Sequence, residues 1–499
     1  MRKIMNPQMQ FGEVDISQIE FDLRCRDEIP KLLMGLRHIY CTPELRAKVF
    51  EVLKDIIPEG VDPDNGCPGM HLWKIFVLGT LRLNCNWDYD KLHDIANNHM
   101  TLRQMIGHGI RNEEDKYALQ TLKDNVSLFT PEILDRINQV VVEAGHTLLG
   151  KKKDDLKGRC DSFVVETNVH YPTDINLLFD AIRKVIGLTA SLCSEAGIPG
   201  WRQSRHNIRK VKKLFLKAQN LYRSKPKKEK SRIRKAKLIK EAHLAYLGVV
   251  KLFLSRVGET LQIIREETLV NQIKLMQIEG YIKHAERQID QVQRRVINGE
   301  TIAHDEKVFS IFEQHTEWIS KGKAGVSQEL GLRVCLLEDQ FGFILHHLVM
   351  EKQTDDKVAV PITRGAKERF PNLNGCSYDK GFYSPSNRKR LQIILAKVIL
   401  PKKGKLSIKD KEIEYSEEFI KLRRQHSAVE SAINALENHS LDRCPDHGID
   451  GFKRYVALAI VARNIQILGN LIQQKELKRR KRLEKLKRKK HEKRYSCAA

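Results

Sequence analysis

Segments with the composition of β-strands occur at two places that lie far apart in the chain. The first, "SFVVETNV" (residues 162–169), is short and rich in β-branched residues. The next, "VFSIFEQ", "LGLRVCLLED" and "FGFILHHLVM", come after residue 305, and the last two are close enough to form a hairpin. Residues 175–300 between them are polar and have an almost wholly helical pattern. The chain therefore predicts one mixed α/β domain that is interrupted by a helical insertion.

Residues 28–150 have the apolar spacing of several helices. Two short helical pieces around a polar break, in "DYDKLHDIANNHMTLRQMIGHG", resemble a helix-turn-helix layout, although small bundles that do not contact DNA have the same pattern. We predict a helical, DNA-contacting domain over 1–150, a mixed domain over 155–470 that is interrupted at about 175–305, and a polybasic tail over 471–499.

Positive charge is concentrated in residues 202–240 and in the tail over 471–499. The whole chain has 88 Lys and Arg against 63 Asp and Glu, a formal net charge of +25, which is typical of proteins with a polyanionic partner, most often nucleic acid. Residues 202–240 contain 17 Lys or Arg and a single acid, Glu229. A solvated helical face could have this composition, but the lack of compensating acids favours a phosphate-binding track that includes Arg209, Lys212 and Lys213.

Other classes of protein are disfavoured by what the sequence lacks. No run of about 18 apolar residues occurs, so we expect no membrane association, and the N-terminal residues have no apolar signal core. The ten cysteines form no C-x-x-C pair, which makes a zinc finger improbable and fits reduced thiols in a cytosol.

Three acids lie in or beside the first strand segment, in "RCDSFVVETNVHYPTD". Because side chains alternate along a strand, Asp161 and Glu166 point to opposite faces. Asp174 follows Pro172 at the start of a helix, where an acid commonly caps the helix or complements its dipole. An acid among apolar strand neighbours is costly unless it is paired or binds metal, so Asp161 is the preferred candidate ligand and Asp174 the reserve.

Two further acids lie at positions that suit chemistry. Asp379, in "CSYDKGFYSPSN", ends a short strand, and Gly381 would permit a sharp turn after it, although Asp before Gly is also common in ordinary turns. Glu430, in "FIKLRRQHSAVESAINALENH", lies at the edge of an apolar helical stripe, with His426 one turn before it.

Three blocks, "CDSFVVETNVHYPTD", "YDKGFYSP" and "RRQHSAVESAINALENHSLDRCPDHGIDGFKRYVALAIVARNIQILG", resemble those of bacterial insertion-sequence transposases of the DDE type, most closely the ISNCY group. The resemblance covers most of the chain. It implies a ribonuclease-H-like fold in which Asp161, Asp379 and Glu430 are catalytic and hold two Mg²⁺ ions, for which Mn²⁺ can substitute. The implied fold is α/β, with a mixed sheet and a long helical insertion.

The resemblance also indicates which residues contact DNA. Related transposases carry a Tyr, Arg, Glu, Lys signature around the glutamate, but here Arg423 stands at the Tyr position and His426 at the Arg position. Arg423, His426 and Lys380 are candidates to steady phosphate. Lys321 and Lys323, in "WISKGKAG", are similar candidates, although loop lysines of this kind often only solvate a surface.

The resulting expectation is a cytoplasmic, nucleoid-associated transposase that binds double-stranded DNA, both transposon ends and target, as a homo-oligomer. It would hydrolyse a phosphodiester at the terminal inverted repeats and transfer the freed 3′-hydroxyl to target DNA. Two alternatives stay open: a catalytically silent DNA-binding regulator derived from a transposase, and a related nuclease without strand transfer.

Overall fold

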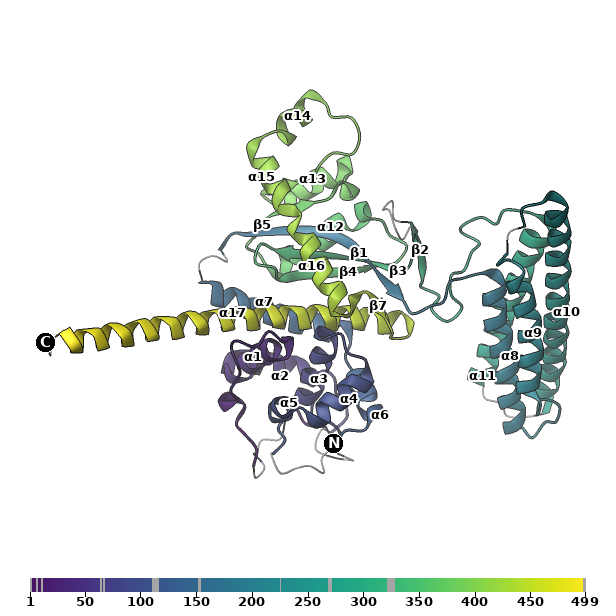
Figure 1. Ribbon diagram of the computed structural model, residues 1–499, viewed down its shortest axis with the longest axis horizontal. Coiled ribbons are helices and arrows are strands. Elements are labelled where there is room, and N and C mark those ends of the chain that lie inside the picture. Colours follow the sequence, from purple (N-terminus) through teal and green to yellow (C-terminus); the bar gives the residue numbers. More distant parts are fainter. Residues whose placement is uncertain are drawn as a thin grey trace. The chain divides into compact units, whose positions relative to one another are not determined.

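The computed structural model describes residues 2–5, 8–9, 12–62, 65, 68–109, 116–150, 154–224, 226–267, 272–320 and 328–496. It divides into two compact units. Unit 1 comprises Met1–Asn168 and Ile319–Ala499, and unit 2 comprises Val169–Trp318. A mixed α/β architecture is thus confirmed, with a helical segment inserted between strands of one sheet (Figure 1).

Unit 1 begins with helices and contains the sheet, except for the first two residues of β2. Its N-terminal elements are η1 (Ile16–Gln18), α1 (Glu28–Cys41), α2 (Pro43–Lys54), α3 (Leu72–Asn84), α4 (Tyr89–Asn98), α5 (Met100–Met105), α6 (Leu119–Val126) and α7 (Pro131–Leu149). The strands are β1 (Leu156–Thr167), β2 (Glu317–Ser320), β3 (Gln328–Asp339), β4 (Ile344–Met350), β5 (Leu373–Tyr378), β6 (Lys397–Ile399) and β7 (Arg443–Cys444). The later helices are α12 (Asp355–Arg369), η4 (Lys380–Phe382), α13 (Pro385–Ile394), α14 (Ile408–Glu414), α15 (Glu417–His426), α16 (Ala428–Leu436), η5 (Glu437–Leu441) and α17 (Gly448–Ser496).

The sheet is mixed, with β1 near its centre. Its order is β2-β3-β1-β5-β6, and β4 and β7 pair with β3 and β1. β3 runs antiparallel to both β1 and β4, and β3 and β4 form the predicted hairpin. β5 runs parallel to β1, and β6 runs parallel to β5. Helix α12 packs on β3 and β4, while α15 packs on β5 and β6 and α16 on β1. The elements that surround the site described below are therefore all fixed by this sheet.

Helix α17 is the central helix of unit 1. It lies alongside α7 and also packs on α1 and α3 (Figure 1). Asn464 of α17 is fully buried, donates to Asn138 of α7 at 2.7 Å and exchanges hydrogen bonds with the backbone of Ile344 in β4. Because a buried amide is stable only when it is satisfied, these bonds fix the position of α17 against both neighbours.

The apolar part of α17 also bears on membrane association. Residues Gly448–Lys487 form one helix that is long and apolar enough to cross a membrane by length and composition, but 72% of its most apolar window is buried inside the protein. A core helix has the same composition, and α17 packs against α1, α3 and α7.

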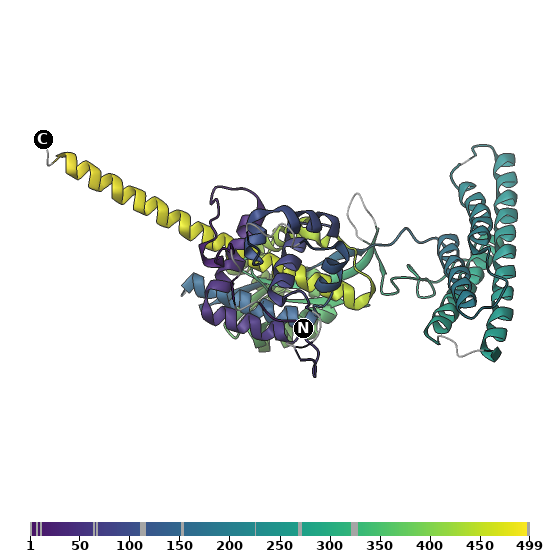
Figure 2. The same cartoon turned by 90° about the horizontal axis from the view of Figure 1, so that it is seen from below.

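Unit 2 is a bundle of helices that lie side by side in both views (Figures 1 and 2). The helices are α8 (Asp174–Glu195), α9 (Ser204–Asn220), α10 (Glu229–Glu267), α11 (Gln272–Val292) and the short η3 (Gln293–Asn298). Their core contains apolar residues such as Ile182, Phe215, Tyr246 and Ile278.

One predicted strand is wrong. "VFSIFEQ" (residues 308–314) is not extended, and the strand of this region is β2, which begins three residues later. The reason is local: the hydroxyl of Ser310 accepts hydrogen bonds from the backbone N–H groups of Phe312 and Glu313, which turns the chain. Ile311 then joins the core of the helical bundle instead of a sheet.

Candidate active site

Asp161 and Asp379 follow directly after paired positions of two parallel strands. In the register of β1 and β5, Cys160 lies opposite Tyr378, and each acid is the next residue of its strand or loop. Asp161 is half-buried and Asp379, the residue after β5, is exposed. Neighbouring parallel strands lie about 5 Å apart, so the sheet itself brings the two carboxylates together although they are 218 positions apart in the sequence.

Glu430 reaches the same place from the helices that cover this face of the sheet. It lies in the first turn of α16, which packs on β1, and is exposed. One turn earlier, Nδ1 of His426 lies 3.0 Å from the hydroxyl of Ser377, which is on β5 two residues before Asp379. This contact ties the end of α15, just before the helix that carries Glu430, to the strand that precedes Asp379.

A fourth carboxylate, which the sequence reasoning missed, completes the cluster. Asp355 begins α12, and its Oδ1 accepts a hydrogen bond of 2.6 Å from the hydroxyl of Ser162 on β1. A Cβ at Gly381 would lie 2.9 Å from Oδ2 of Asp355, so glycine is needed there because the loop after Asp379 approaches this carboxylate closely. The expected sharp turn after Asp379 is present as η4, a single 3₁₀ turn, although Gly381 does not have a positive φ.

The pKa of Asp161 reflects the other three carboxylates of the cluster. Burial raises the pKa of Asp161 to about 6, the backbone N–H of Ser162 opposes this at 2.7 Å, and the negative charges of Asp379, Asp355 and Glu430 raise the pKa further. Within the described part of the chain, no Lys or Arg forms an ion pair with any of the four carboxylates. Four acids without a cation are a donor set that suits a hard divalent ion.

Three of the predicted phosphate contacts, Lys380, Arg423 and His426, are close in the sequence to Asp379 or Glu430. Lys380 directly follows Asp379 and is exposed, and Arg423 is exposed one turn before His426. Burial lowers the pKa of His426, against the opposing influence of Asp379 and Glu430, and its Nε2 is buried with no hydrogen-bond partner among the described residues. Lys321 and Lys323 fall outside the described residues.

The other two acids of the first strand segment have partners elsewhere. Glu166 forms an ion pair of 3.0 Å with Arg443. Asp174 lies in the first turn of α8, where the hydroxyl of Thr173, not Asp174, accepts the capping hydrogen bond. Oδ2 of Asp174 pairs instead with Nη1 of Arg295 at 3.0 Å. Both acids are therefore charge partners of arginines.

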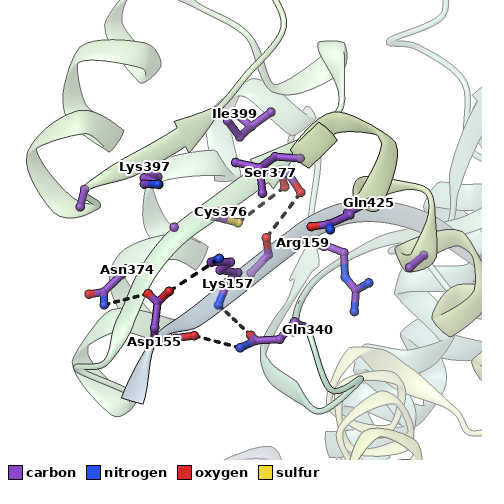
Figure 3. A pocket seen from close by; sticks show the side chains of 15 residues that line it. Asp155, Lys157, Arg159, Gln340, Asn374, Cys376, Ser377, Lys397, Ile399 and Gln425 are labelled. Atoms are coloured by element: carbon purple, nitrogen blue, oxygen red, sulfur yellow. Dashed lines mark hydrogen bonds and ion pairs between the residues drawn. The ribbon is translucent and has the colours of Figure 1, made fainter. Parts of the chain in front are cut away.

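A cavity of about 540 Å³ is lined by residues of β1, β5 and β6 (Figure 3). It extends from Arg159 and Ser377, two residues before Asp161 and Asp379, toward Lys157, Asn374 and Lys397. Its cations are already paired with carboxylates: Lys157 with Asp155 at 3.7 Å, Arg159 with Glu338 at 2.9 Å, and Lys397 with Glu418 at 2.5 Å. This pairing disfavours the cavity as a phosphate site.

A second group with metal-ligand chemistry is Asp135, His346 and His347, whose ligand atoms lie within 4.8 Å of one another. The guanidinium of Arg369 pairs with both oxygens of Asp135 and contacts Nδ1 of His346. Burial and this cation lower the pKa of His347 to about 4. The guanidinium that contacts Asp135 and His346 repels a second cation, which disfavours a metal ion at these three residues.

A comparison with protein families found one match that includes part of this site. The family model described as "Transposase DDE domain" matches residues 298–465, which include Asp355, Asp379 and Glu430. Over these residues the chain is similar to the DDE domain of insertion-sequence transposases. The match begins after β1 and does not include Asp161, so the position of Asp161 beside Asp379 rests on the register of β1 and β5. No curated protein and no solved structure matches the chain.

Proposed function

We propose that this protein is the transposase of an insertion sequence of the ISNCY group, which binds the terminal inverted repeats, hydrolyses a phosphodiester there and transfers the 3′ end to target DNA. The observation that carries this proposal is the grouping of Asp379, Glu430 and Asp355 around Asp161, beside the middle of β1 and the carboxyl end of β5. The match of residues 298–465 to the transposase DDE domain supports metal-dependent phosphodiester chemistry for this cluster. The sheet order and the late position of α16 also support a ribonuclease-H-like catalytic domain.

Asp161, Asp379 and Glu430 would hold divalent metal, Mg²⁺ or Mn²⁺, with Asp355 as an additional carboxylate. The raised pKa of Asp161 supports this, because part of the rise comes from negative charges that a cation would neutralise. When bound, two such ions activate a hydroxyl nucleophile and stabilise the leaving oxygen of a phosphodiester. Ser162 orients Asp355, and His426 holds the α15–α16 junction against β5. Lys380 and Arg423 lie where they can steady the phosphates of the bound strand.

Metal binding should change the thermal stability of the protein in the absence of DNA. Because the pKa of Asp161 is about 6 in the folded protein and lower when unfolded, the folded state binds more protons between about pH 4 and 6. The contribution of Asp161 to stability is therefore lost as the pH rises through this window. We expect MgCl₂ to raise the Tm of wild type by about 2–4 °C at about pH 7.5 and by less at about pH 5. Asp161→Asn should remove most of this difference in thermal denaturation, and an equal Mg²⁺ effect in both proteins would contradict the assignment.

DNA binding is proposed for the basic helices of unit 2. Arg209, Lys212 and Lys213 are exposed on α9 and, at spacings of three and four residues, share one helical face. Replacing all three by Ala is expected to weaken DNA binding and to lower the slope of log K against log salt by about 0.9 for each phosphate that is no longer neutralised.

The matched control for this salt titration removes the same charge elsewhere. Lys405, Lys409 and Lys411 lie in or beside α14 and are also exposed. Their triple Ala variant should keep the wild-type slope. Equal slopes for both variants would show that α9 is not part of the DNA contact.

The helical N-terminal segment is the proposed reader of the transposon ends. The proposed assembly is a homo-oligomer on DNA, and its proposed location is the cytoplasm, in association with the nucleoid.

The proposal is tested by incubating the protein and Mg²⁺ with a duplex that carries the inverted repeat and with a supercoiled target. Cleavage at the repeat followed by joining of its 3′ end to target DNA is the expected result. Cleavage with no joined product would indicate the nuclease, and binding without cleavage would indicate the silent regulator.

A further inference from the structure

Helix α10 exposes an apolar stripe on the side directly opposite its packed face. Tyr246, Val250 and Val257 are buried in the core of the bundle. On the opposite side, Leu244 and Leu252 are 51% and 53% exposed, and a Cβ at Gly248 between them would meet no atom within 4 Å. Exposed leucines at this spacing form an apolar patch on a helix of 39 residues, and such patches often mark interaction surfaces.

The residues of this face are arranged symmetrically about Gly248. At 100° per residue, positions 237, 241, 244, 248, 252, 255 and 259 fall within about 40° of one direction. Leu244 and Leu252 lie four residues before and after Gly248. Two further exposed apolar residues, Ile233 and Ile263, lie fifteen residues before and after it and are 65% and 45% exposed. Four of the five large apolar residues exposed on the described part of α10 thus form two pairs that share one centre.

The charges follow the same symmetry with opposite signs. Lys237 precedes Gly248 by eleven residues and Glu259 follows it by eleven. Lys237 is 80% exposed, and its present partner is Glu241 on the same helix at 4.0 Å, a weak pair. An antiparallel copy of α10 with its two-fold axis at Gly248 would place Lys237 opposite the second copy's glutamate at 259, twice in the same interface.

We propose that this face of α10, defined by Ile233, Lys237, Leu244, Gly248, Leu252, Glu259 and Ile263, binds the same face of a second copy of the chain. The two helices would run antiparallel, with Leu244 of one copy packed beside the leucine at 252 of the other, as in the layers of an antiparallel coiled coil. Glycine at the centre lets the helix axes approach closely. A self-complementary patch of this kind forms a closed two-fold dimer. The inference does not depend on the proposed function, because the contact involves neither DNA nor the acid cluster.

Charge exchange tests the pairing directly. The full chain without DNA is analysed by sedimentation over a range of concentrations. Lys237→Glu and Glu259→Lys should each raise the dimer dissociation constant about tenfold or more, and the double variant should return to within about threefold of wild type. A structural defect would not be repaired by the second substitution. If the double variant lost as much dimerisation free energy as the two single variants together, the proposal would be overturned.

Two further pairs of variants decide the apolar part. Leu252→Lys should leave a monomer with an unchanged Tm, whereas Met276→Lys, which alters a 70% exposed residue of α11, should dimerise as wild type does. Gly248→Cys should form a disulfide-linked dimer under mild oxidation, while Ala236→Cys, exposed on a different side of α10, should not. A monomeric wild type together with a Gly248→Cys variant that does not cross-link, or a dimer that Leu252→Lys leaves intact, would overturn the proposal.

Discussion

Asp161→Asn is expected to reduce Mg²⁺-dependent cleavage of an inverted-repeat duplex by about 10³-fold or more. Asp161 is the most buried of the three predicted acids, and the charges of Asp379, Asp355 and Glu430 all act on it. Asn keeps the size of the side chain but removes the charge that would hold a cation. Asp379→Asn and Glu430→Gln should have effects of similar size, and DNA binding measured without metal should change by less than about threefold in each variant.

Glu166→Gln is the matched control for these substitutions. Glu166 is an acid of the same strand, but it points to the opposite face and pairs with Arg443. Exposed ion pairs contribute at most about 1 kcal/mol, so this variant should cleave at nearly the wild-type rate. Asp355→Asn tests the added carboxylate, and we expect an intermediate loss of about 10–100-fold. If the variants of the four clustered acids cleave as fast as the Glu166→Gln control, the acid cluster is not the catalytic centre.

Gly469→Ala is expected to have the largest effect on stability. Gly469 of α17 crosses Gly35 of α1, and a Cβ at Gly469 would overlap the carbonyl oxygen of Lys31. This neighbour is backbone, so α1 and α17 would have to separate, which would loosen the packing between the two helices. We expect a loss of about 3 kcal/mol in the free energy of unfolding and a Tm lower by about 5–10 °C in thermal denaturation.

The matched control is Gly79→Ala in α3, another buried helical glycine of unit 1. There the nearest atoms to an added Cβ are side-chain carbons of Leu458 and Phe129 at 3.4 Å, an ordinary contact distance. Because alanine favours helix over glycine by about 1 kcal/mol, the Tm should stay within a few degrees of wild type. An equal loss in both variants would show that the α1–α17 crossing is not specially sensitive to added volume.

The sequence was sufficient to predict Asp161, Asp379 and Glu430 as candidates, because each stands at the end of a strand pattern or at the edge of a helical stripe. It was not sufficient to find Asp355. Two adjacent acids at a helix start, Asp355 and Asp356, look like ordinary partners of the helix dipole. Only the packing of α12 on β3 and β4, which lets Asp355 accept a hydrogen bond from Ser162 of β1, brings Asp355 into the cluster.

Helical and strand patterns differed in how well they could be predicted. Segments with a long apolar period, such as α7 and α17, form helices as expected. The error at residues 308–314 arose because a short apolar run cannot by itself distinguish a strand from an apolar turn that packs on helices. The symmetry of α10 about Gly248 is present in the sequence, but its meaning depends on knowing which side of α10 the bundle buries.

The most direct test of the central claim is the location of Mn²⁺ in crystals of the full chain by anomalous scattering. A peak among Asp161, Asp379 and Glu430, within bonding distance of their carboxylate oxygens and absent in crystals of Asp161→Asn, is the predicted result. A protein that binds Mn²⁺ at Asp135, His346 and His347 and leaves the acid cluster without a peak would contradict the account.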